Sequence, residues 1–273
     1  MKGLLLEIKD YRIYLRMIRA SIQARMEYRG SFFMYIFTVL GFYGAQIAVI
    51  GVMLARFKKI GGWSTADIAF LYSLLVMSQG IASMTCSGLM EFSQFIRDGS
   101  FDRLLLRPLS TLMQMLTMRF EPAGVAHFIL GIAAFFAAQA LSPIDWGPVT
   151  VLMYVGAVLG GSAILASVRI MVAAAAFFTV TNAGLQHLAV FSAREFLLYP
   201  VDIYSRPIRF ILTFFFPLAF INFYPAHYFL NKDSSALFHP AFIYLTLPIG
   251  ILMLALAGFS WAFAVRHYSS TGN

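Results

Sequence analysis

Long stretches without a single Asp, Glu, Lys or Arg dominate the chain. These uncharged stretches cover residues 30–55, 68–90, 122–144, 146–168, 170–193, 210–231 and 234–265. Each is longer than the roughly 18–20 apolar residues that a helix needs to cross a hydrocarbon core about 30 Å thick. Segments of this length are helical in lipid, because lipid offers no hydrogen-bond partner to an exposed backbone N–H or C=O. The pattern therefore predicts an all-α, polytopic membrane protein.

We expect about six membrane-spanning helices in one domain over residues 31–273. They are predicted near 31–55, 67–90, 122–142, 147–172, 208–229 and 238–265. Only Arg169 interrupts the uncharged sequence between 146 and 193, and two antiparallel spans need a loop, so we interpret 147–181 as one long helix. Residues 185–198 are then expected to form a short helix on the cytoplasmic surface. Seven spans remain an alternative.

The first 30 residues follow a different pattern. Apolar residues recur every three or four positions from Leu4 to Met26, and basic residues repeat with the same spacing on another face. An apolar stripe backed by a basic one is typical of a helix that lies in the membrane interface. We therefore predict that segment 1–30 is an amphipathic helix on the cytoplasmic face. The alternative is a helix that packs against a partner protein.

The positions of the basic residues predict the orientation. The chain has 20 Lys and Arg against 12 Asp and Glu, a formal net charge of +8. With a cytoplasmic N-terminus, only Arg56, Lys58, Lys59 and Lys232 fall outside, and all the others lie in segments assigned to the cytoplasmic side. Because cytoplasmic loops carry an excess of Lys and Arg, both termini are expected to be cytoplasmic. The same rule explains the positive charge, so we expect no nucleic-acid partner.

The sequence lacks a recognisable catalytic motif. Charged residues make up 12% of the chain, and no Gly-Lys pair is present, so we expect no phosphate-binding loop and no ATP hydrolysis by this chain. The histidines and the single Cys86 lack the spacing of zinc ligands. His127 lies within a predicted span and is interpreted as a hydrogen-bonded packing residue, with a proton relay as the alternative. We predict a protein that is not an enzyme and holds no cofactor or metal.

The acidic residues bear on the energy source of any transport. All twelve Asp and Glu lie outside the central parts of the predicted spans, whereas ion-coupled transporters usually hold acids deep in the bundle. A transporter of this composition is expected to take its energy from another subunit. An ATP-independent secondary transporter or channel remains an alternative. A membrane-embedded lipid enzyme that would use Asp98 or Asp102 is a further one.

Two groups of motifs resemble a known family. The first is Glu-Phe-Ser-Gln-Phe-Ile-Arg-Asp-Gly-Ser-Phe-Asp-Arg-Leu-Leu-Leu-Arg-Pro-Leu at 91–109. The second comprises Leu-Tyr-Pro-x-x-Ile-Tyr at 198–204, Leu-Thr-Phe-Phe-Phe-Pro-Leu-Ala-Phe at 212–220 and Tyr-Pro-Ala at 224–226. Together with length and span order, these motifs resemble the six-span permease subunits of ABC transporters in the type-2 export superfamily. The most similar branch is that of bacterial uncharacterised permeases with a separate ATPase.

The resemblance implies one permease half of an ATP-driven exporter in the bacterial plasma (inner) membrane. A dimer of ABC ATP-binding subunits would carry ATP and Mg, and a second permease copy or a sister permease would complete the path. Loop 91–121 would form the coupling helix that docks on the ATPase. The implied interface consists of Phe95, Ile96, Arg97, Asp98, Gly99, Phe101, Asp102, Arg103 and Arg107.

The residues of this loop suit such a role. Gly99 permits a tight turn, and Asp102 can cap the helix that follows. Phe95, Ile96 and Phe101 are apolar groups in a polar loop, which a partner could cover. The alternative is a capped loop whose arginines only follow the charge rule.

The outer end holds candidates for an extracellular gate, namely Pro217, Tyr224 and Pro225. As in related exporters, the fifth span would break there before it re-enters the outer leaflet; a plain proline kink is the alternative. Gly156-x-x-x-Gly160 predicts close helix contact within the subunit or at a dimer seam. The cargo is expected to be amphipathic or hydrophobic.

Overall fold

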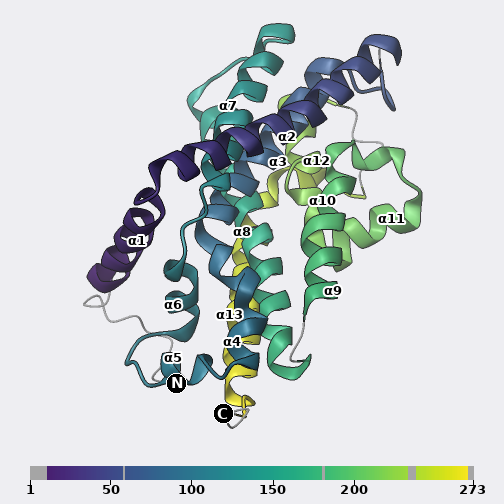
Figure 1. Ribbon diagram of the computed structural model, residues 1–273. Helices are drawn as coiled ribbons and strands as arrows, with labels where there is room; N and C mark the ends of the chain where they lie inside the picture. The colour runs from purple at the N-terminus through teal and green to yellow at the C-terminus, as the bar shows by residue number, and fades with distance from the viewer. Residues whose placement is uncertain (1–10, 58, 180–181, 233–237, 270–273) are drawn as a thin grey trace.

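The computed structural model describes residues 11–57, 59–179, 182–232 and 238–269, and this part of the chain is helical with no strand (Figure 1). The helices, in chain order, are α1 (Tyr11–Met26), α2 (Arg29–Phe57), α3 (Thr65–Cys86), α4 (Phe92–Arg97), α5 (Phe101–Leu105), α6 (Thr111–Met118), α7 (Ala123–Leu141), α8 (Pro148–Thr179), α9 (Ala183–Gln186), α10 (Ala193–Glu195), α11 (Arg206–Phe210), α12 (Phe223–Phe229) and α13 (Thr246–Arg266). The all-α prediction is confirmed. The beginning of the predicted amphipathic segment, with Leu4 and Ile8, lies outside the described residues.

A central bundle is formed by α3, α7, α8 and α13. Helix α3 packs against both α7 and α8, and α13 covers another side of α8. Buried side chains such as Phe70, Leu74 and Ile164 fill the space between these helices. We call the end of the bundle with α4, α5 and the last turn of α13 the inner end, and the end with the turn Ile60–Trp63 the outer end (Figure 1).

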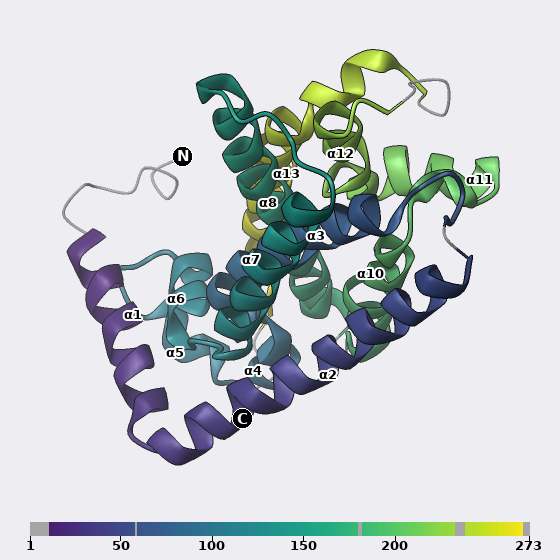
Figure 2. The same ribbon diagram turned by 90° about the horizontal axis from the view of Figure 1, so that it is seen from above.

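Helices α1 and α2 meet at an angle and lie along two adjoining sides of the molecule, with α1 on the side of α6 (Figure 2). Helix α1 packs on α6, where the Tyr14 hydroxyl oxygen accepts a hydrogen bond from the Ser110 N–H at 3.1 Å. Helix α2 contacts mainly α7 and leaves large apolar side chains exposed, among them Phe37 and Val52. Exposed apolar side chains on a polytopic protein are suited to lipid or to a second subunit.

Four helical stretches of the described residues are long and apolar enough to cross a membrane. They are Thr65–Arg97, Ala123–Leu141, Pro148–Thr179 and Thr246–Arg266, and a bent pair, Arg206–Phe215 with Pro217–Phe229, makes a fifth if it counts as one span. A polytopic membrane protein is therefore the fold class. The finer count of six spans stays a prediction.

The second predicted span continues further than the sequence suggested. A capping box begins α3, because the Ser64 hydroxyl accepts from the Asp67 N–H and the Asp67 carboxylate accepts from the Ser64 N–H. After Cys86 the chain continues through the 3₁₀ turn Ser87–Glu91 into α4. Two more short helices, α5 and α6, follow before α7 begins at Ala123. Much of loop 91–121 is thus folded into helices.

The structure corrects the prediction for 185–198. This segment consists of α9, a π-helical turn (His187–Ser192), α10 and a 3₁₀ turn (Phe196–Leu198). It starts near the inner end of α3, because Gln186 Nε2 donates to the Met90 carbonyl at 3.0 Å. Figure 1 shows that it then rises along the bundle instead of lying across the inner end.

The end of the same segment lies near the outer part of α3. Asn222 Nδ2 donates to the Leu197 carbonyl at 2.8 Å and to the Leu71 carbonyl at 3.4 Å. Residues 183–198 therefore run beside α3 over most of its length. The sequence pattern failed here because Arg194 and Glu195 were assigned to a surface, whereas Arg194 is buried between helices.

The predicted fifth span at 208–229 is not one straight helix. It bends by 74° between Phe215 and Pro217. Phe216 has φ −113° and ψ 99°, an extended conformation favoured before proline. The chain on both sides lies near the outer end, because Asp202 contacts Trp63 and Lys232 contacts Asp67 there. The segment therefore enters and leaves at the same end of the bundle.

The glycines at 160 and 161 allow close helix packing within the subunit. A Cβ at Gly160 would lie 2.6 Å from the Thr246 carbonyl oxygen of α13, and one at Gly161 would lie 2.6 Å from Ser78 Oγ of α3. Gly156 has more room, with its nearest neighbour, Leu247, at 3.8 Å. The predicted close contact thus involves Gly160 rather than Gly156, and it lies inside the subunit.

Candidate transport site

A tight turn at Gly99 separates α4 from α5 at the inner end. Gly99 has φ +68°, a conformation that glycine adopts without steric cost. The Asp98 carboxylate closes the turn by accepting a hydrogen bond from the Ser100 N–H at 3.0 Å. Hydrogen bonds from the Ser100 amide and hydroxyl, aided by the Arg103 charge, hold the pKa of the exposed Asp98 carboxyl below its usual range.

Asp102 does not cap α5 as the sequence suggested. Ser100 occupies the cap position and makes no side-chain cap hydrogen bond, while Asp102 lies in the first turn of the helix. The Asp102 N–H donates to the Gly99 carbonyl at 3.2 Å. An acid in the first turn still interacts favourably with the positive end of the helix dipole.

An aromatic cluster lies beneath this turn. Phe101 has ring-centroid distances of 5.5 Å to Phe92, 5.0 Å to Phe177 and 5.1 Å to Tyr268, and Trp261 lies 4.8 Å from Phe92. The cluster joins the loop to the inner ends of α8 and α13. Phe101 is fully buried in it.

Two of the predicted docking residues are consequently unavailable to a partner. Ile96 is 2% exposed and Phe101 0% exposed within the chain itself, while Phe95 is half-buried. Their apolar side chains pack within the chain and stabilise the loop, so they are not exposed for a second protein to cover. This differs from the sequence-based expectation that a partner covers them.

Other residues form the exposed face of the loop. The predicted residues that are exposed there are Arg97, Asp98, Arg103 and Arg107. Between the last two, Leu105 is 44% and Leu106 86% exposed, whereas Leu104 is buried. Sequence reasoning missed these two leucines, although three consecutive leucines on a short helix cannot all face one core. Basic and apolar groups alternate on this face.

Helix α6 fixes the exposed face to the bundle. The buried Gln114 Nε2 donates to the Leu104 carbonyl at 3.1 Å and to the Leu109 carbonyl at 3.2 Å. The Leu104 carbonyl lies in the last turn of α5, where carbonyls lack a partner within the helix, and Leu109 lies in the connection to α6. The face is therefore held on both sides, by Gln114 and by the aromatic cluster.

The three gate candidates lie inside a packed structure at the outer end. Pro217, Tyr224 and Pro225 are all buried. The Tyr224 and Thr213 hydroxyls share a hydrogen bond at 2.9 Å, which joins the two arms of the bent segment 206–229. At the outer end this segment is packed beside α3, where Asn222 Nδ2 donates to the Leu71 carbonyl at 3.4 Å.

Contacts between distant segments close the outer end further. Lys232 Nζ lies 2.6 Å from the Asp67 carboxylate and 5.0 Å from the ring centre of Trp63. The Trp63 indole N–H donates to Asp202 at 2.9 Å. An ion pair, a cation–π contact and a hydrogen bond thus connect three separate loops.

A polar cavity of about 260 Å³ lies towards the inner end of the bundle. Helices α2, α3, α7 and α8 supply its walls, and its polar lining includes Tyr43, Gln79, Ser83, His127 and Arg169. Both ring nitrogens of the buried His127 lack a hydrogen-bond partner among the described residues. His127 is therefore not the hydrogen-bonded packing residue that the sequence suggested.

Arg169 is the buried cation of this cavity. It is 6% exposed, and its Nη2 donates to Ser83 Oγ at 3.3 Å. No carboxylate of the described residues forms an ion pair with it. An arginine within a membrane-spanning helix costs about 3 kcal/mol, so such residues are retained mainly at functional positions.

A second buried arginine connects α10 with α2. Arg194 is 7% exposed, and its guanidinium carbon lies 4.4 Å from the ring centre of Tyr43. It donates to the Tyr43 hydroxyl at 3.2 Å and to Gln46 Oε1 at 3.4 Å. Its acidic neighbour Glu195 lies 3.7 Å away and is half exposed.

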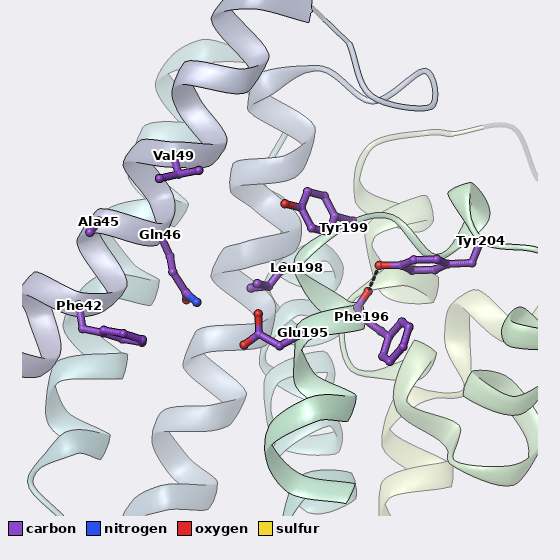
Figure 3. Close-up of a pocket in the computed structure, with 9 residues that line it drawn as sticks. All are labelled: Phe42, Ala45, Gln46, Val49, Glu195, Phe196, Leu198, Tyr199 and Tyr204. Carbon is purple, nitrogen blue, oxygen red and sulfur yellow. Dashed lines mark hydrogen bonds between the residues drawn. The ribbon is translucent and has the colours of Figure 1, made fainter. Parts of the chain in front are cut away.

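A larger apolar groove lies between α2 and the segment from α10 to Tyr204 (Figure 3). Its volume is about 550 Å³, and its lining consists of Phe42, Ala45, Gln46, Val49, Glu195, Phe196, Leu198, Tyr199 and Tyr204. The Tyr204 hydroxyl donates to the Phe196 carbonyl at 3.1 Å and stabilises one wall. Gln46, which binds Arg194, lies on the other wall.

The comparison with protein families shows to which family the chain belongs. Residues 40–272 match the family model described as ABC-2 family transporter protein. The chain belongs to the ABC-2 transporter family. No curated protein and no solved structure gives a significant match.

Membership in the ABC-2 family confirms that this chain is a multi-pass membrane permease, a transport component of an ABC transporter. The match begins within α2 and extends through α13, so it includes the inner loop, the apolar groove, the bent outer segment and the lining of the polar cavity except Tyr35 and Val39. The two buried arginines are features of this ABC-2 chain that the sequence analysis did not single out as a site. The available signal was Arg169, a single charge between the uncharged stretches 146–168 and 170–193, whereas Arg194 is followed directly by Glu195.

Proposed function

We propose that this chain is the permease subunit of an ATP-driven exporter and couples to a separate ATP-binding subunit dimer through loop 91–121. The observation that supports this most is the exposed basic and apolar face of α4 and α5, fixed to α8 and α13 by the aromatic cluster. An interface that carries force needs both a docking surface and a rigid connection. Phe101 and its neighbours supply the connection, and Arg97, Arg103, Leu106 and Arg107 supply the surface.

The proposal includes a topology. Six crossings would be made by α2, α3 with α4, α7, α8, residues 183–198 and α13, and the bent segment 206–229 would re-enter from the outside. Both termini would lie in the cytoplasm of a bacterial cell, which the inner end of the bundle would face. Relative to the sequence prediction, this moves the fifth crossing from 208–229 to 183–198.

The transport cycle follows from these parts. ATP binding by the partner subunits would pull two inner loops together, one from each permease, which is either a second copy or a sister chain. The loop would move α8 and α13 with it and shift the bundle between inward-open and outward-open states. The closed outer end, with Pro217, Tyr224 and Pro225, would act as the gate.

Co-expression with candidate ATP-binding subunits tests the proposal. We expect a detergent-stable complex with ATPase activity, and we expect the double variant Leu106→Asp/Arg107→Glu to weaken it at least tenfold. The matched control is Lys59→Glu, a charge reversal on an exposed residue at the outer end. A well-folded permease that binds no ATP-binding subunit and shows ion-driven flux would instead establish a secondary transporter.

A further inference from the structure

The buried Arg169 of the polar cavity has no acidic partner among the described residues, and the nearby Arg194 has only the half-exposed Glu195, at 3.7 Å. Arg169 Nε and Arg194 Nε both lack a hydrogen-bond partner among the described residues, although both side chains are more than nine-tenths buried. A buried cation in a medium of low dielectric constant is stabilised by an anion that approaches it. Guanidinium groups whose hydrogen-bonding capacity is incompletely used favour an anionic ligand over a neutral or cationic one.

Two carboxylates line this cavity. Glu91 forms an ion pair with Arg119, both of these side chains are partly exposed, and Glu121 precedes the N-terminus of α7. The buried polar residues of the lining include instead Arg169, Ser83, Gln79 and His127. Hydroxyl, amide and guanidinium donors around one space are suited to the oxygens of a phosphate or carboxylate.

The polar cavity and the apolar groove adjoin each other at Arg194. Tyr43 lines the cavity and Gln46, one turn further along α2, lines the groove, and Arg194 donates a hydrogen bond to each of them. A ligand with its charged end in the cavity could therefore extend into the groove. The groove has room for an apolar chain, whereas the cavity is smaller than typical sites for drug-sized ligands.

The order of the two sites along the bundle matches a lipid in the inner leaflet. On α2, the cavity is lined by Tyr35, Val39 and Tyr43, and the groove begins at Phe42 and continues to Val49. The cavity thus lies nearer the inner end, and the groove extends towards the outer end, where Asp202 contacts Trp63. An amphiphile in the cytoplasmic leaflet has its head group and apolar chain in this order.

We propose that Arg169 and Arg194 bind the anionic head group, a phosphate or carboxylate, of an amphipathic cargo whose apolar chain occupies the groove between α2 and residues 195–204. This inference rests on the proposed export function and names the chemical class of its cargo. The site would admit the cargo laterally from the inner leaflet. Glu195, close to Arg194, would disfavour a second negative charge beyond the head group.

Binding to the full-length permease alone tests the inference without any ATP-binding subunit. The protein in dodecyl maltoside is titrated with dodecyl phosphate, inorganic phosphate or dodecyltrimethylammonium, and the shift in apparent melting temperature is measured. We expect dodecyl phosphate to act at concentrations at least tenfold below those of inorganic phosphate, and the cationic amphiphile to give no saturable shift. If inorganic phosphate and dodecyl phosphate shift the melting temperature at comparable concentrations, the assignment of an amphiphilic ligand is overturned.

Variants separate the head-group site from the groove. Arg169→Gln should raise the half-maximal concentration of dodecyl phosphate at least tenfold, Arg169→Lys should do so less, and Arg266→Gln, an exposed arginine at the inner end, should have no effect. Ala45→Trp, which fills the groove from an exposed position, should weaken the binding of dodecyl phosphate but not the binding of inorganic phosphate. The last variant leaves both arginines intact, so it remains informative if Arg169→Gln does not fold.

Two outcomes distinguish this inference from the proposed function. Unchanged binding in Arg169→Gln and Arg194→Gln, or equal binding of the cationic amphiphile, would overturn the anionic-cargo site even if an active ATPase complex forms. Selective, arginine-dependent binding of dodecyl phosphate by a chain that recruits no ATP-binding subunit would support the site and overturn only the ATP-driven mechanism.

Discussion

The indole N–H of Trp63 donates a hydrogen bond to Asp202 Oδ2 at 2.9 Å, across 139 positions of the chain. Trp63 lies in the turn between α2 and α3, and Asp202 lies between the 183–198 segment and α11. Both segments are therefore at the same end of the bundle. The consequence is that residues 183–198 must run from the inner end to the outer end before Asp202.

Single cysteines test this topology. In a Cys86→Ala background, Ser205→Cys and Lys59→Cys should react with a membrane-impermeant maleimide from outside intact cells, because both positions are exposed at the outer end. Asp98→Cys should react only in inverted vesicles. Labelling of Ser205→Cys together with Asp98→Cys would instead return residues 185–198 to the cytoplasmic surface.

The hydrogen bond between Tyr224 and Thr213 should stabilise the closed outer end. Tyr224→Phe removes one partner of a buried pair and is expected to cost about 1 kcal/mol of stability, with a faster leak of small solutes through liposomes. Tyr244→Phe, at an exposed position, is the control. A double-mutant cycle with Thr213→Val measures the pair; a coupling energy of zero would contradict a role in closure.

Phe101 is expected to contribute to the stability of the permease rather than to direct contact with the ATP-binding subunit. Phe101→Ala empties the centre of the aromatic cluster, and truncations of this kind cost roughly 3–5 kcal/mol. We expect a large fall in the melting temperature of the permease alone, and a small one for Phe101→Leu. If Phe101→Ala retains its melting temperature but loses the ATP-binding subunit, the residue is a direct docking contact after all.

Gly160 and Gly156 form a matched pair for a test of helix packing. Gly160→Ala places a Cβ against the α13 backbone and should destabilise the protein by about 1–3 kcal/mol, because backbone atoms there cannot move aside. Gly156→Ala meets no such obstacle and should be tolerated. The free energy of unfolding of both variants is measured by chemical denaturation. Equal values would show that α8 and α13 separate more easily than the structure indicates.

The turn at Gly99 should depend on pH only under acidic conditions. The pKa of Asp98 is lowered in the folded chain by the hydrogen bonds from Ser100, so its contribution is present above the ordinary carboxyl pKa and is lost as the pH falls through the lowered folded value. Binding of the ATP-binding subunit should therefore be insensitive to Asp98 protonation near neutral pH. Asp98→Asn should remove the acid-induced loss of loop order, measured by proteolysis between α4 and α5; unchanged acid sensitivity would contradict the role of this carboxylate.

The sequence predicted the parts of the fold that depend on hydropathy alone. Helices α7 and α8 lie within a few residues of the predicted spans at 122–142 and 147–181, because long apolar runs in lipid have few alternatives to a helix. The turn at Gly99 was also predictable, since only a glycine adopts its φ without strain. These features follow from local chemistry.

Features that depend on tertiary contacts were not predictable in this way. The charged pair Arg194-Glu195 indicated a surface helix, yet Tyr43 and Gln46 from α2 provide Arg194 with a buried site. Likewise, Phe101 in a polar loop suggested a partner, whereas Phe177 and Tyr268 from distant segments cover it. In both cases the deciding contacts come from residues far apart in the sequence.

The aromatic cluster beneath α5 gives the inner loop the mechanical character of a lever arm. Phe101 contacts side chains from the ends of α8 and α13, and Trp261 lies in α13 itself. Under the proposed function, we expect a push on the loop to tilt these two long helices together as one stiff body. Since α8 carries Arg169, the same tilt would change the width of the polar cavity, so a force applied at the inner end would reach the proposed cargo site without a separate relay.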